Sequence, residues 1–493
     1  MLDFSWLWGD IPRWLSVMWT VIDMGIRIVM LGVVPGNRRP TTAMAWLLAI
    51  FFIPILGLAL FLLFGNFRMS RRRTLRQAVI NERVLSETKH LDLDDEDQNL
   101  PGWVHSAVAM NRRLGGMPLV RGNSVEFLTD YRESIQAMTE AVRTARSYVH
   151  VEFYIVGDDD EVVGPFLDAL VAAADRGVNV RFLFDHLGTM RVSGYRKLLK
   201  RLDDSKISYR RMLPLAPVHG QWRRPDLRNH RKIVVVDGTV AFTGSQNLIE
   251  PGYKRAASRQ MGREWVELMA RVRGPLVASL DVVFTTDWSQ ETDENLLDDV
   301  RSITPLNEPG AVSGQLVPSG PGFSAENNLR LFTTLIYSAT RELRITSPYF
   351  VPDDSLLYAV TTAAQRGVKV KLYVSERGDQ ALAHHAQQSY YRSLLTAGVE
   401  IYLYEAPHVL HTKCFTVDNE VAVFGSSNMD MRSFSLNFEI SMMLLGPEIV
   451  ERLDKVMDEY ESKSKRVKLG MWNARTPFER WKDNVARLSA TLQ

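Results

Sequence analysis

One short polar motif occurs twice in this chain of 493 residues, with the same internal spacing each time. The first copy consists of His230, Lys232, Asp237 and the run Gly244–Asn247. The second copy consists of His411, Lys413, Asp418 and the run Gly425–Asn428. A duplicated set of this kind predicts two similar halves that build one site together.

The spacing within each copy has a structural reading. Residues two apart on a strand share a face, so His230 and Lys232 are predicted to point the same way, as are His411 and Lys413. Asp237-Gly238 is a hairpin signal between two β-rich runs, and Asp418-Asn419 lies at the equivalent place. A two-residue turn would put His230 opposite Ser245 and His411 opposite Ser426. The glycine before each serine would let the backbone approach a ligand closely.

The residue types suit a phosphate group. Lysine supplies charge, serine and asparagine supply hydrogen bonds, and histidine acts as a nucleophile or carries a proton. The candidate catalytic residues are therefore His230, Lys232, Asp237, His411, Lys413 and Asp418. The candidate substrate-binding residues are Ser245, Asn247, Ser426 and Asn428. For the two aspartates, a role as turn formers competes with direct catalysis.

The two copies resemble the paired H-x-K-x4-D-x6-G-S-x-N motifs of the phospholipase D superfamily. Their flanks resemble one branch of it, the bacterial cardiolipin synthases. The stretches that carry this similarity are His150–Ile155, Leu227–Gly238, Leu410–Lys413 and Gly425–Glu439, together with the apolar N-terminal region. The resemblance covers nearly the whole chain.

The resemblance implies a mechanism. One histidine attacks phosphorus and forms a phosphohistidine, while the other protonates the leaving alcohol and later deprotonates the incoming one. By analogy the nucleophile is assigned to His230. The family also places a carboxylate after each motif to orient an imidazole. Glu439 matches that position in the second half, and Glu264 is the best match in the first half, with Glu267 as a rival.

The expected activity is a phosphatidyl transfer in the membrane, in which two phosphatidylglycerol molecules give cardiolipin and glycerol. The alternatives are a phospholipase D hydrolase, another phosphatidyltransferase of the superfamily, a nuclease and a non-enzymatic scaffold. The net charge of +2 and the apolar N-terminus argue against nucleic acid as a partner. Neither the acceptor nor the oligomeric state is visible in the sequence.

We expect no metal and no other cofactor. Two lysines already supply positive charge, and the adjacent pair His384-His385 would point in different directions on a helix. Four arginines near the first motif are candidates for holding a second anionic group, against the alternative of a solvated basic loop: Arg223, Arg224, Arg228 and Arg231. The single cysteine, Cys414, is expected to be a buried core thiol.

The N-terminal region is predicted to form a transmembrane helical hairpin. Thr41–Gly65 holds no charged residue and is long enough to cross a bilayer, with a kink at Pro54. Trp14–Val34 is a second candidate span, in which Asp23 and Arg27 can pair. Five arginines follow, which places the catalytic part in the cytoplasm of a multi-pass cell-membrane protein: Arg68, Arg71, Arg72, Arg73 and Arg76. Arg38 and Arg39 in the short loop count against this orientation.

The remaining sequence predicts an α/β fold: two tandem phospholipase D-like α/β sandwich halves with pseudo-twofold symmetry. The predicted boundaries are 1–68 for the hairpin, 69–116 for a connector, 117–300 and 301–465 for the halves, and 466–493 for a helical tail. In each half a strand, a helix and a strand follow one another, as in Tyr148–Ile155, Val163–Arg176 and Val178–Phe184. The tail is expected to dock on the core through Phe478, Trp481, Val485 and Leu488; membrane contact is the alternative.

Overall fold

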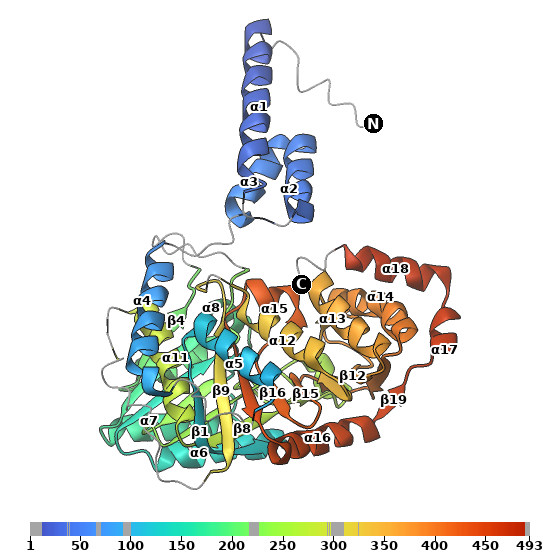
Figure 1. The fold of residues 1–493 in the computed structure, drawn as a ribbon. Helices are drawn as coiled ribbons and strands as arrows, with labels where there is room; N and C mark the ends of the chain where they lie inside the picture. Colours follow the sequence, from blue (N-terminus) through green and yellow to red (C-terminus); the bar gives the residue numbers. More distant parts are fainter. Residues whose placement is uncertain are drawn as a thin grey trace. The chain divides into compact units, whose positions relative to one another are not determined.

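A computed structural model describes residues 12–36, 38, 40–65, 71–91, 100–215, 226–292, 294, 296, 310–323 and 325–488. The chain divides into two compact units, Met1–Arg68 and Met69–Gln493 (Figure 1). We describe each unit by itself.

The first unit contains three apolar helices, α1 (Arg13–Val33), α2 (Pro40–Phe52) and α3 (Pro54–Phe64). Among the described residues only α1 is long and apolar enough to span a membrane, with a mean hydropathy of 1.6 over Trp14–Val33. Asp23 and Arg27 form the predicted ion pair at 2.7 Å. The predicted span Thr41–Gly65, with its kink at Pro54, is divided into the two helices α2 and α3, because Pro54 has no N–H to continue the helix.

The broken helix folds back on itself. The helices α2 and α3 pack against each other, as Figure 1 shows. The Arg38 guanidinium donates hydrogen bonds to the carbonyl of Gly65 at 2.9 Å and to that of Val34 at 2.6 Å. The residues that bracket the α2–α3 pair therefore lie close together in this unit.

The second unit is built on one mixed sheet of 15 strands. The strand order is β19-β13-β12-β10-β15-β16-β18-β9-β1-β8-β6-β5-β2-β3-β4. Outward from the central antiparallel pair β9–β1, each strand of one half has its counterpart in the other, and β19 is an addition at one edge. The predicted duplication is thus present as one continuous sheet with matched halves.

The first half begins with strand β1 and ends with helix α11. Its strands are β1 (Leu119–Leu128), β2 (Tyr148–Phe153), β3 (Asn179–Asp185), β4 (Ser208–Met212), β5 (Ile233–Val236), β6 (Val240–Gly244), β7 (Trp265–Val266) and β8 (Met269–Arg273). Its helices are α6 (Tyr131–Arg143), α7 (Gly164–Asp175), α8 (His186–Met190), α9 (Tyr195–Asp203), α10 (Ala256–Gln260) and α11 (Leu276–Glu291).

The second half repeats this plan and adds a C-terminal extension. Its strands are β9 (Val312–Ser319), β10 (Glu342–Thr346), β11 (Phe350–Val351), β12 (Lys369–Ser375), β13 (Glu400–Tyr404), β14 (Val409–Leu410), β15 (Cys414–Val417), β16 (Val421–Gly425), β17 (Met429–Asp430), β18 (Glu439–Leu445) and β19 (Ser464–Arg466). Its helices are α12 (Asn327–Ser338), α13 (Asp354–Gln365), α14 (Ala381–Ala397), α15 (Met431–Ser435) and α16 (Pro447–Ser462). The extension holds α17 (Leu469–Asn473) and α18 (Pro477–Arg487).

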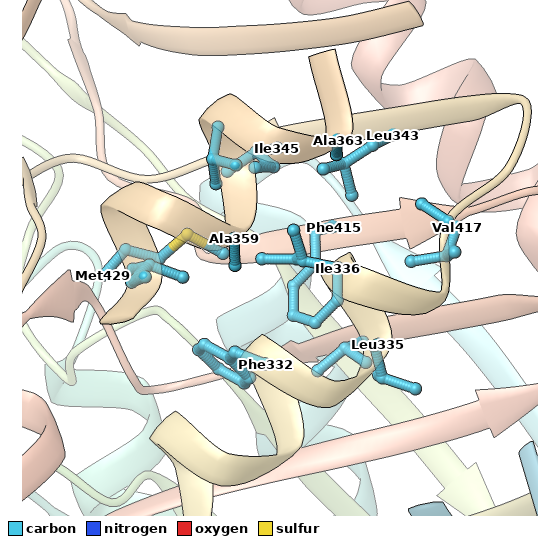
Figure 2. Packing of buried hydrophobic residues seen from close by; sticks show 14 of the residues in the cluster. Phe332, Leu335, Ile336, Leu343, Ile345, Ala359, Ala363, Phe415, Val417 and Met429 are labelled. Carbon is cyan, nitrogen blue, oxygen red and sulfur yellow. The ribbon is translucent and has the colours of Figure 1, made fainter. Parts of the chain in front are cut away.

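Apolar side chains between the sheet and its helices form the core. In the second half, Phe332 and Ile336 of α12 pack against Phe415 of β15 and Ala359 of α13 (Figure 2). The predicted strand–helix–strand runs are present with small shifts at their ends. Helices α7 and α13 are followed by Gly177 and Gly367, whose φ values of 90° and 92° favour glycine. Cys414 is buried, as expected.

The segment before the first half is helical. It contains α4 (Arg71–Glu87), a short turn (Lys89–Leu91) and α5 (Gly102–Gly115). Arg73 forms an ion pair with Glu291 of α11 at 2.8 Å, and Arg76 donates to the carbonyl of Ser289. Two of the five arginines that follow the apolar region, Arg73 and Arg76, are therefore bound to α11 of the second unit.

The C-terminal tail forms the predicted helix, α18, but the predicted face does not dock. Helix α18 packs on α14 through Asp483 and Ala486, which are buried. Phe478 and Trp481 are 64% and 59% exposed, and Val485 and Leu488 are 45% and 82% exposed. The expectation that these four apolar side chains enter the core is wrong.

Candidate active site

Both motif copies open into one cavity of about 860 Å³ in the second unit. Its lining includes the two histidines, the two lysines and the two asparagines of the motifs: His230, Lys232, Asn247, His411, Lys413 and Asn428. The prediction that two half-sites form one site is confirmed by this arrangement. The cavity wall also contains aromatic and basic side chains from both halves, which gives it room for more than a single phosphate.

Each motif is presented by a β-hairpin whose turn has three residues. Ile233 pairs with Thr243 and Val236 with Val240, so Asp237, Gly238 and Thr239 form the turn. The second hairpin is the same, with Cys414 paired to Phe424 and Val417 to Val421. The predicted two-residue turn is therefore wrong. The register moves by one position, so the strand pairing places Lys232 and Lys413, rather than the histidines, nearest to the glycines that precede the serines.

The glycine in each Gly-Ser run lies so close to a neighbouring strand that no side chain would fit. A Cβ at Gly244 would lie 2.2 Å from the carbonyl oxygen of Leu268, and one at Gly425 would lie 2.2 Å from that of Ile440. The expectation that the glycine makes space for a ligand is replaced by this packing reason.

The two motif aspartates are structural. Asp237 accepts hydrogen bonds from the backbone amides of Arg146, Ser147 and Tyr148 at 2.7 to 2.9 Å. Asp418 accepts in the same way from the amides of Thr340, Arg341 and Glu342. Both sit in the hairpin turns with φ values of 52° and 54° and do not line the cavity. Their assignment as catalytic residues is wrong, and the alternative as turn formers is correct.

Each histidine is held by a carboxylate from the other half. The Nδ1 atom of His230 lies 3.1 Å from Oε1 of Glu439, and Nδ1 of His411 lies 2.7 Å from Oε1 of Glu267. Both carboxylates are fully buried as side chains. Burial by itself would raise their pKa values, but the adjacent histidine and lysine lower both pKa values overall. Each carboxylate is thus held ionised, with the Nε2 atom of its imidazole left for chemistry.

Backbone hydrogen bonds also join each histidine to the opposite half. The amide of His230 donates to the carbonyl of Phe438, and the amide of His411 donates to that of Val266, both at 2.8 Å. Strand β14, just before His411, pairs with β7 beside Glu267. These contacts deliver each histidine to the carboxylate of the opposite half.

Glu264 is not the orienting carboxylate of the first half. Its side chain is 51% exposed and lies 3.8 Å from Arg132. The position belongs to Glu267, the rival in the sequence, which also contacts Ser245 and Tyr253. The assignment of Glu439 agrees with the structure.

The motif serines hold the carboxylates. The hydroxyl of Ser245 donates to Oε2 of Glu267 at 2.6 Å, and that of Ser426 donates to Oε2 of Glu439 at 2.5 Å. The same hydroxyls accept the amides of Leu268 and Ile440, each at 2.9 Å. Both serines lie outside the cavity lining, so their assignment as substrate-binding residues is wrong and a positioning role replaces it.

The two lysines carry perturbed pKa values. Burial lowers the pKa of Lys232 to about 8 and that of Lys413 to about 7. Burial likewise lowers the pKa values of His230 and His411, against the opposing charge of their carboxylates. The carboxylates of Glu267 and Glu439 oppose this lowering, and the negative charge of a bound phosphodiester would raise the pKa of both lysines further.

Further polar groups complete the wall. The amide of Asn247 donates to the Tyr253 hydroxyl at 2.9 Å, and that hydroxyl donates to Glu267 at 3.0 Å. The ring of Tyr154 lies 4.2 Å from that of His230. Neither Tyr154 nor Tyr253 was assigned a role from the sequence, although Tyr154 stands in the stretch His150–Ile155 that resembles the family. Their contacts reach the histidine and carboxylate across strands, which no local pattern records.

The arginines near the first motif have mixed outcomes. Arg231 is buried in an ion pair with Asp287, and Arg228 pairs with Asp185 at 3.1 Å. Arg231 also donates to the carbonyl of Glu439 and supports the backbone there. Arg228 lines the cavity, so its role in holding a second anionic group stays a prediction. Arg223 and Arg224 lie outside the described residues, as does most of the Leu213–Leu227 loop. Among the described residues no group of three or more His, Cys, Asp or Glu is arranged to hold a metal ion.

Comparison with known proteins agrees with this geometry. The family described as "Cardiolipin synthase, PLD-like domain" matches residues 138–288 and 332–460, and the family described as "Phospholipase_D-nuclease N-terminal" matches residues 25–66. The chain is 34% identical over 487 residues to "Cardiolipin synthase A" of Yersinia pseudotuberculosis, covering 95% of this chain and 96% of the relative. A protein of the same name from Yersinia pestis bv. Antiqua is also 34% identical, with the same coverage.

A solved structure shares the fold. The phosphatidylserine synthase of Haemophilus influenzae Rd KW20 aligns with a TM-score of 0.60 at 14% sequence identity, over 78% of this chain and 99% of that one. Fold and site together define a phosphatidyltransferase with two phospholipase D-like halves. Within that class, the chain belongs to the cardiolipin synthase family.

The identity of the first-half carboxylate gives a direct test. Glu267→Gln is expected to reduce kcat by about 10²- to 10⁴-fold, since an amide fixes the imidazole less well and does not stabilise its cationic form. Glu264→Gln, three residues earlier and exposed, serves as the matched control and should retain near-normal kcat. The measurement is turnover of the purified variants in lipid vesicles. A larger loss in Glu264→Gln than in Glu267→Gln would contradict the assignment.

Proposed function

We propose that this membrane enzyme joins two phosphatidylglycerol molecules into cardiolipin through a phosphohistidine. The observation that carries the proposal is the crosswise pair of carboxylate-bound histidines facing one cavity, with a lysine beside each. One histidine is needed to bond phosphorus and the other to move a proton. The surroundings of His230 and His411 are nearly equivalent in geometry, so the assignment of His230 as nucleophile follows the family analogy.

The first step forms the covalent intermediate. Nε2 of His230 attacks phosphorus of the first lipid, and the bond between phosphorus and the headgroup glycerol oxygen breaks. Protonated His411 gives its proton to that oxygen, so neutral glycerol leaves. Lys232, Lys413 and the amides of Asn247 and Asn428 surround the phosphoryl oxygens, where negative charge builds in the transition state.

In the second step, the hydroxyl of a second lipid displaces His230 from phosphorus. Neutral His411 accepts the proton of a terminal hydroxyl on a second phosphatidylglycerol. The resulting oxygen attacks phosphorus, and the bond from phosphorus to His230 breaks. One phosphodiester replaces another and His411 is protonated again, so the cycle is balanced without an outside energy source.

The molecule that accepts the phosphatidyl group determines whether the enzyme acts as a synthase or as a hydrolase. The cavity extends past the histidines to side chains from both halves, among them Arg191, Lys254 and Asp379. A second headgroup with its own phosphate and hydroxyls can fill this space and exclude water, which favours transfer to lipid. Phosphatidic acid, the product of transfer to water, is therefore expected as a minor product.

Product analysis tests the proposed function. The full-length protein in vesicles of phosphatidylglycerol with deuterated headgroup is expected to release labelled glycerol and to form cardiolipin with one labelled bridging glycerol. Lipid mass spectrometry identifies both, with His411→Ala as the inactive control. Phosphatidic acid as the main product in intact bilayers would replace the synthase by a hydrolase.

We propose further that the catalytic unit faces the cytoplasm, and the prediction of two membrane crossings stays a prediction. The basic run after the first unit supports the orientation. Two crossings require α2 and α3 to open around Ile53 into one continuous helix. Under that arrangement Gly36→Cys, in the loop after α1, is expected to react with an impermeant maleimide added outside intact cells. Labelling only after lysis would mean that the loop returns to the cytoplasmic side.

The pKa values of the site predict a narrow pH optimum for kcat/KM. His230 must be neutral to attack and His411 must be protonated to give its proton to the leaving oxygen. Because burial lowers the pKa of both histidines, kcat/KM falls at low pH as His230 gains a proton and begins to fall at higher pH as His411 loses its proton. The lysines lose charge as pH rises through about 7 for Lys413 and about 8 for Lys232, so kcat/KM falls there too. Because bound phosphate holds the lysine protons, the alkaline limb of kcat should lie at higher pH. Lys413→Arg, which stays charged, should move the alkaline limb of kcat/KM upward. A flat profile from about pH 5 to about pH 10 would contradict these assignments.

A further inference from the structure

The C-terminal helix α18 presents an apolar face to the outside of the second unit. Phe478, Trp481, Val485 and Leu488 are spaced for one side of a helix, and all four are exposed. The rings of Phe478 and Trp481 stack with centroids 5.9 Å apart. Exposed Leu469 and Met471 on α17, just before, extend the apolar surface. We call Leu469, Met471, Phe478, Trp481, Val485 and Leu488 the tail face.

The helix is firmly seated, so this exposure is a property of a formed element. Thr476 and Glu479 form a capping box at its start. Buried Asp483 lies 2.8 Å from Nδ1 of His385 on α14 and 2.7 Å from Arg475. The Arg487 guanidinium lies 4.5 Å from the centre of the Tyr390 ring. These contacts fix the opposite side of α18 to α14 and leave the tail face outward.

The charges around the tail face are mainly positive. Arg480, Lys482 and Arg487 belong to α18, and Lys468 precedes α17. The two acidic residues of α18 are already used, because Glu479 caps the helix and Asp483 is buried in ion pairs. An apolar stripe with tryptophan, bordered by lysine and arginine, matches an anionic lipid surface, where aromatic rings sit at headgroup level.

The place of α18 connects this surface to the active site. It lies along α14, and the start of α14 contributes Gln380, Leu382 and Ala383 to the lining of the catalytic cavity. Figure 1 shows α15 and α18 in the upper part of the second unit, with α6 and α16 in its lower part. Residues of α8 and α15 also line the cavity. Helix α18 therefore lies at the same end of the unit as elements that line the catalytic cavity.

We propose that the tail face docks the catalytic unit on the surface of an anionic bilayer, holding the cavity next to the lipid it consumes. This inference rests on the proposed function for its purpose, since a lipid substrate keeps its acyl chains in the bilayer while its headgroup enters the site. Burial of the four α18 side chains in the interface supplies the apolar contribution, and the basic border supplies attraction to anionic headgroups.

Fluorescence of the full-length protein in nanodiscs tests the docking. The chain has one cysteine, the buried Cys414, so a thiol added at the surface can be labelled selectively. Val485→Cys carrying an environment-sensitive dye is expected to shift to the blue and to be quenched by spin-labelled lipid in nanodiscs containing phosphatidylglycerol. Thr144→Cys, exposed at the end of α6, is the matched control and should show neither change.

Kinetics on vesicles provide the second readout. Val485→Asp is expected to raise the apparent KM for lipid at the vesicle surface by about tenfold with little change in kcat, because a buried charge weakens interfacial binding. Asn484→Asp adds the same charge at the neighbouring position on the polar side and should change KM by less than about twofold. A fall in kcat with unchanged KM would instead indicate damage to the fold or site and would overturn the docking role.

The outcomes separate this proposal from its rivals. Quenching does not depend on turnover, so it remains if the product proves to be phosphatidic acid and the proposed synthase fails. An unquenched dye at position 485 in anionic nanodiscs overturns the docking. A second copy of the chain as the occupant is shown by a blue-shifted dye in detergent without lipid and by a dimer in light scattering that Val485→Asp dissociates, and this result also overturns the proposal.

Discussion

Replacing either His230 or His411 with alanine is expected to abolish phosphatidyl transfer, with a loss of about 10⁴-fold or more in turnover. The imidazoles face the same cavity, and each is oriented by the carboxylate of the opposite half. Neither can replace the other, because one must bond phosphorus while the other carries the proton. Turnover of purified variants in phosphatidylglycerol vesicles measures the effect.

A trapping experiment distinguishes the two roles. With a lipid whose headgroup is a good leaving group, protonation is no longer needed for the first step. His411→Ala is then expected to accumulate the covalent phosphatidyl-protein on His230, whereas His230→Ala forms none. Mass spectrometry of the digested protein locates the modified residue. Accumulation on His411 in His230→Ala would exchange the two assignments, and near-normal activity of either variant would refute the shared site. His150, a buried histidine 2.7 Å from Asp281 and outside the cavity lining, is not expected to become modified.

Replacing Lys232 or Lys413 with methionine is expected to lower kcat by about a hundredfold or more, since each ammonium stabilises charge that develops on the phosphoryl oxygens. Methionine keeps much of the volume of the buried stem, so the fold should survive. The Lys413 variant should also lose the fall in kcat/KM near pH 7 that accompanies deprotonation of this lysine, whose pKa is about 7. Single-turnover measurement of phosphohistidine formation isolates the chemical step.

Lys371 offers a matched control for the lysine variants. Like Lys413, it belongs to the second half. It is partly buried, forms an ion pair with Glu461 at 2.7 Å and lies outside the cavity lining. Lys371→Met is expected to change stability far more than kcat. A site variant that lost only apparent affinity for lipid, with kcat preserved, would mean that the lysine binds the ground state and contributes nothing specific to the transition state.

The sequence was sufficient for residues whose role depends on local spacing. His230 and Lys232 reach the same cavity because the motif repeats with fixed offsets, and the α/β alternation of both halves follows from periodicity. The turn length was mispredicted because Thr239 is added after the Asp237-Gly238 turn: its amide donates to the Val236 carbonyl at 3.0 Å, yet Val236 pairs with Val240. The dipeptide signal does not reveal this extra residue, which moves the register by one position.

The errors concern contacts between distant parts of the chain. Glu267, and not Glu264, meets His411 because β7 pairs with β14 of the other half, and local pattern carries no information about that pairing. The serines were misassigned for a related reason, since their carboxylate partners arrive from neighbouring strands. For the tail, the spacing of Phe478, Trp481 and Val485 predicted an amphipathic helix correctly, but amphipathicity does not say which surface the apolar side meets.

The exchange of carboxylates between halves also controls when the enzyme becomes active. During synthesis the first half emerges with Glu267 and His230 in place but with neither of their partners, His411 and Glu439, yet made. Its imidazole has no fixed tautomer, and its carboxylate has no cation to keep it charged in the interior. A nascent chain is therefore expected not to cleave lipid until the second half has been made and β14 has paired with β7. Activity then begins only when the whole catalytic unit has folded.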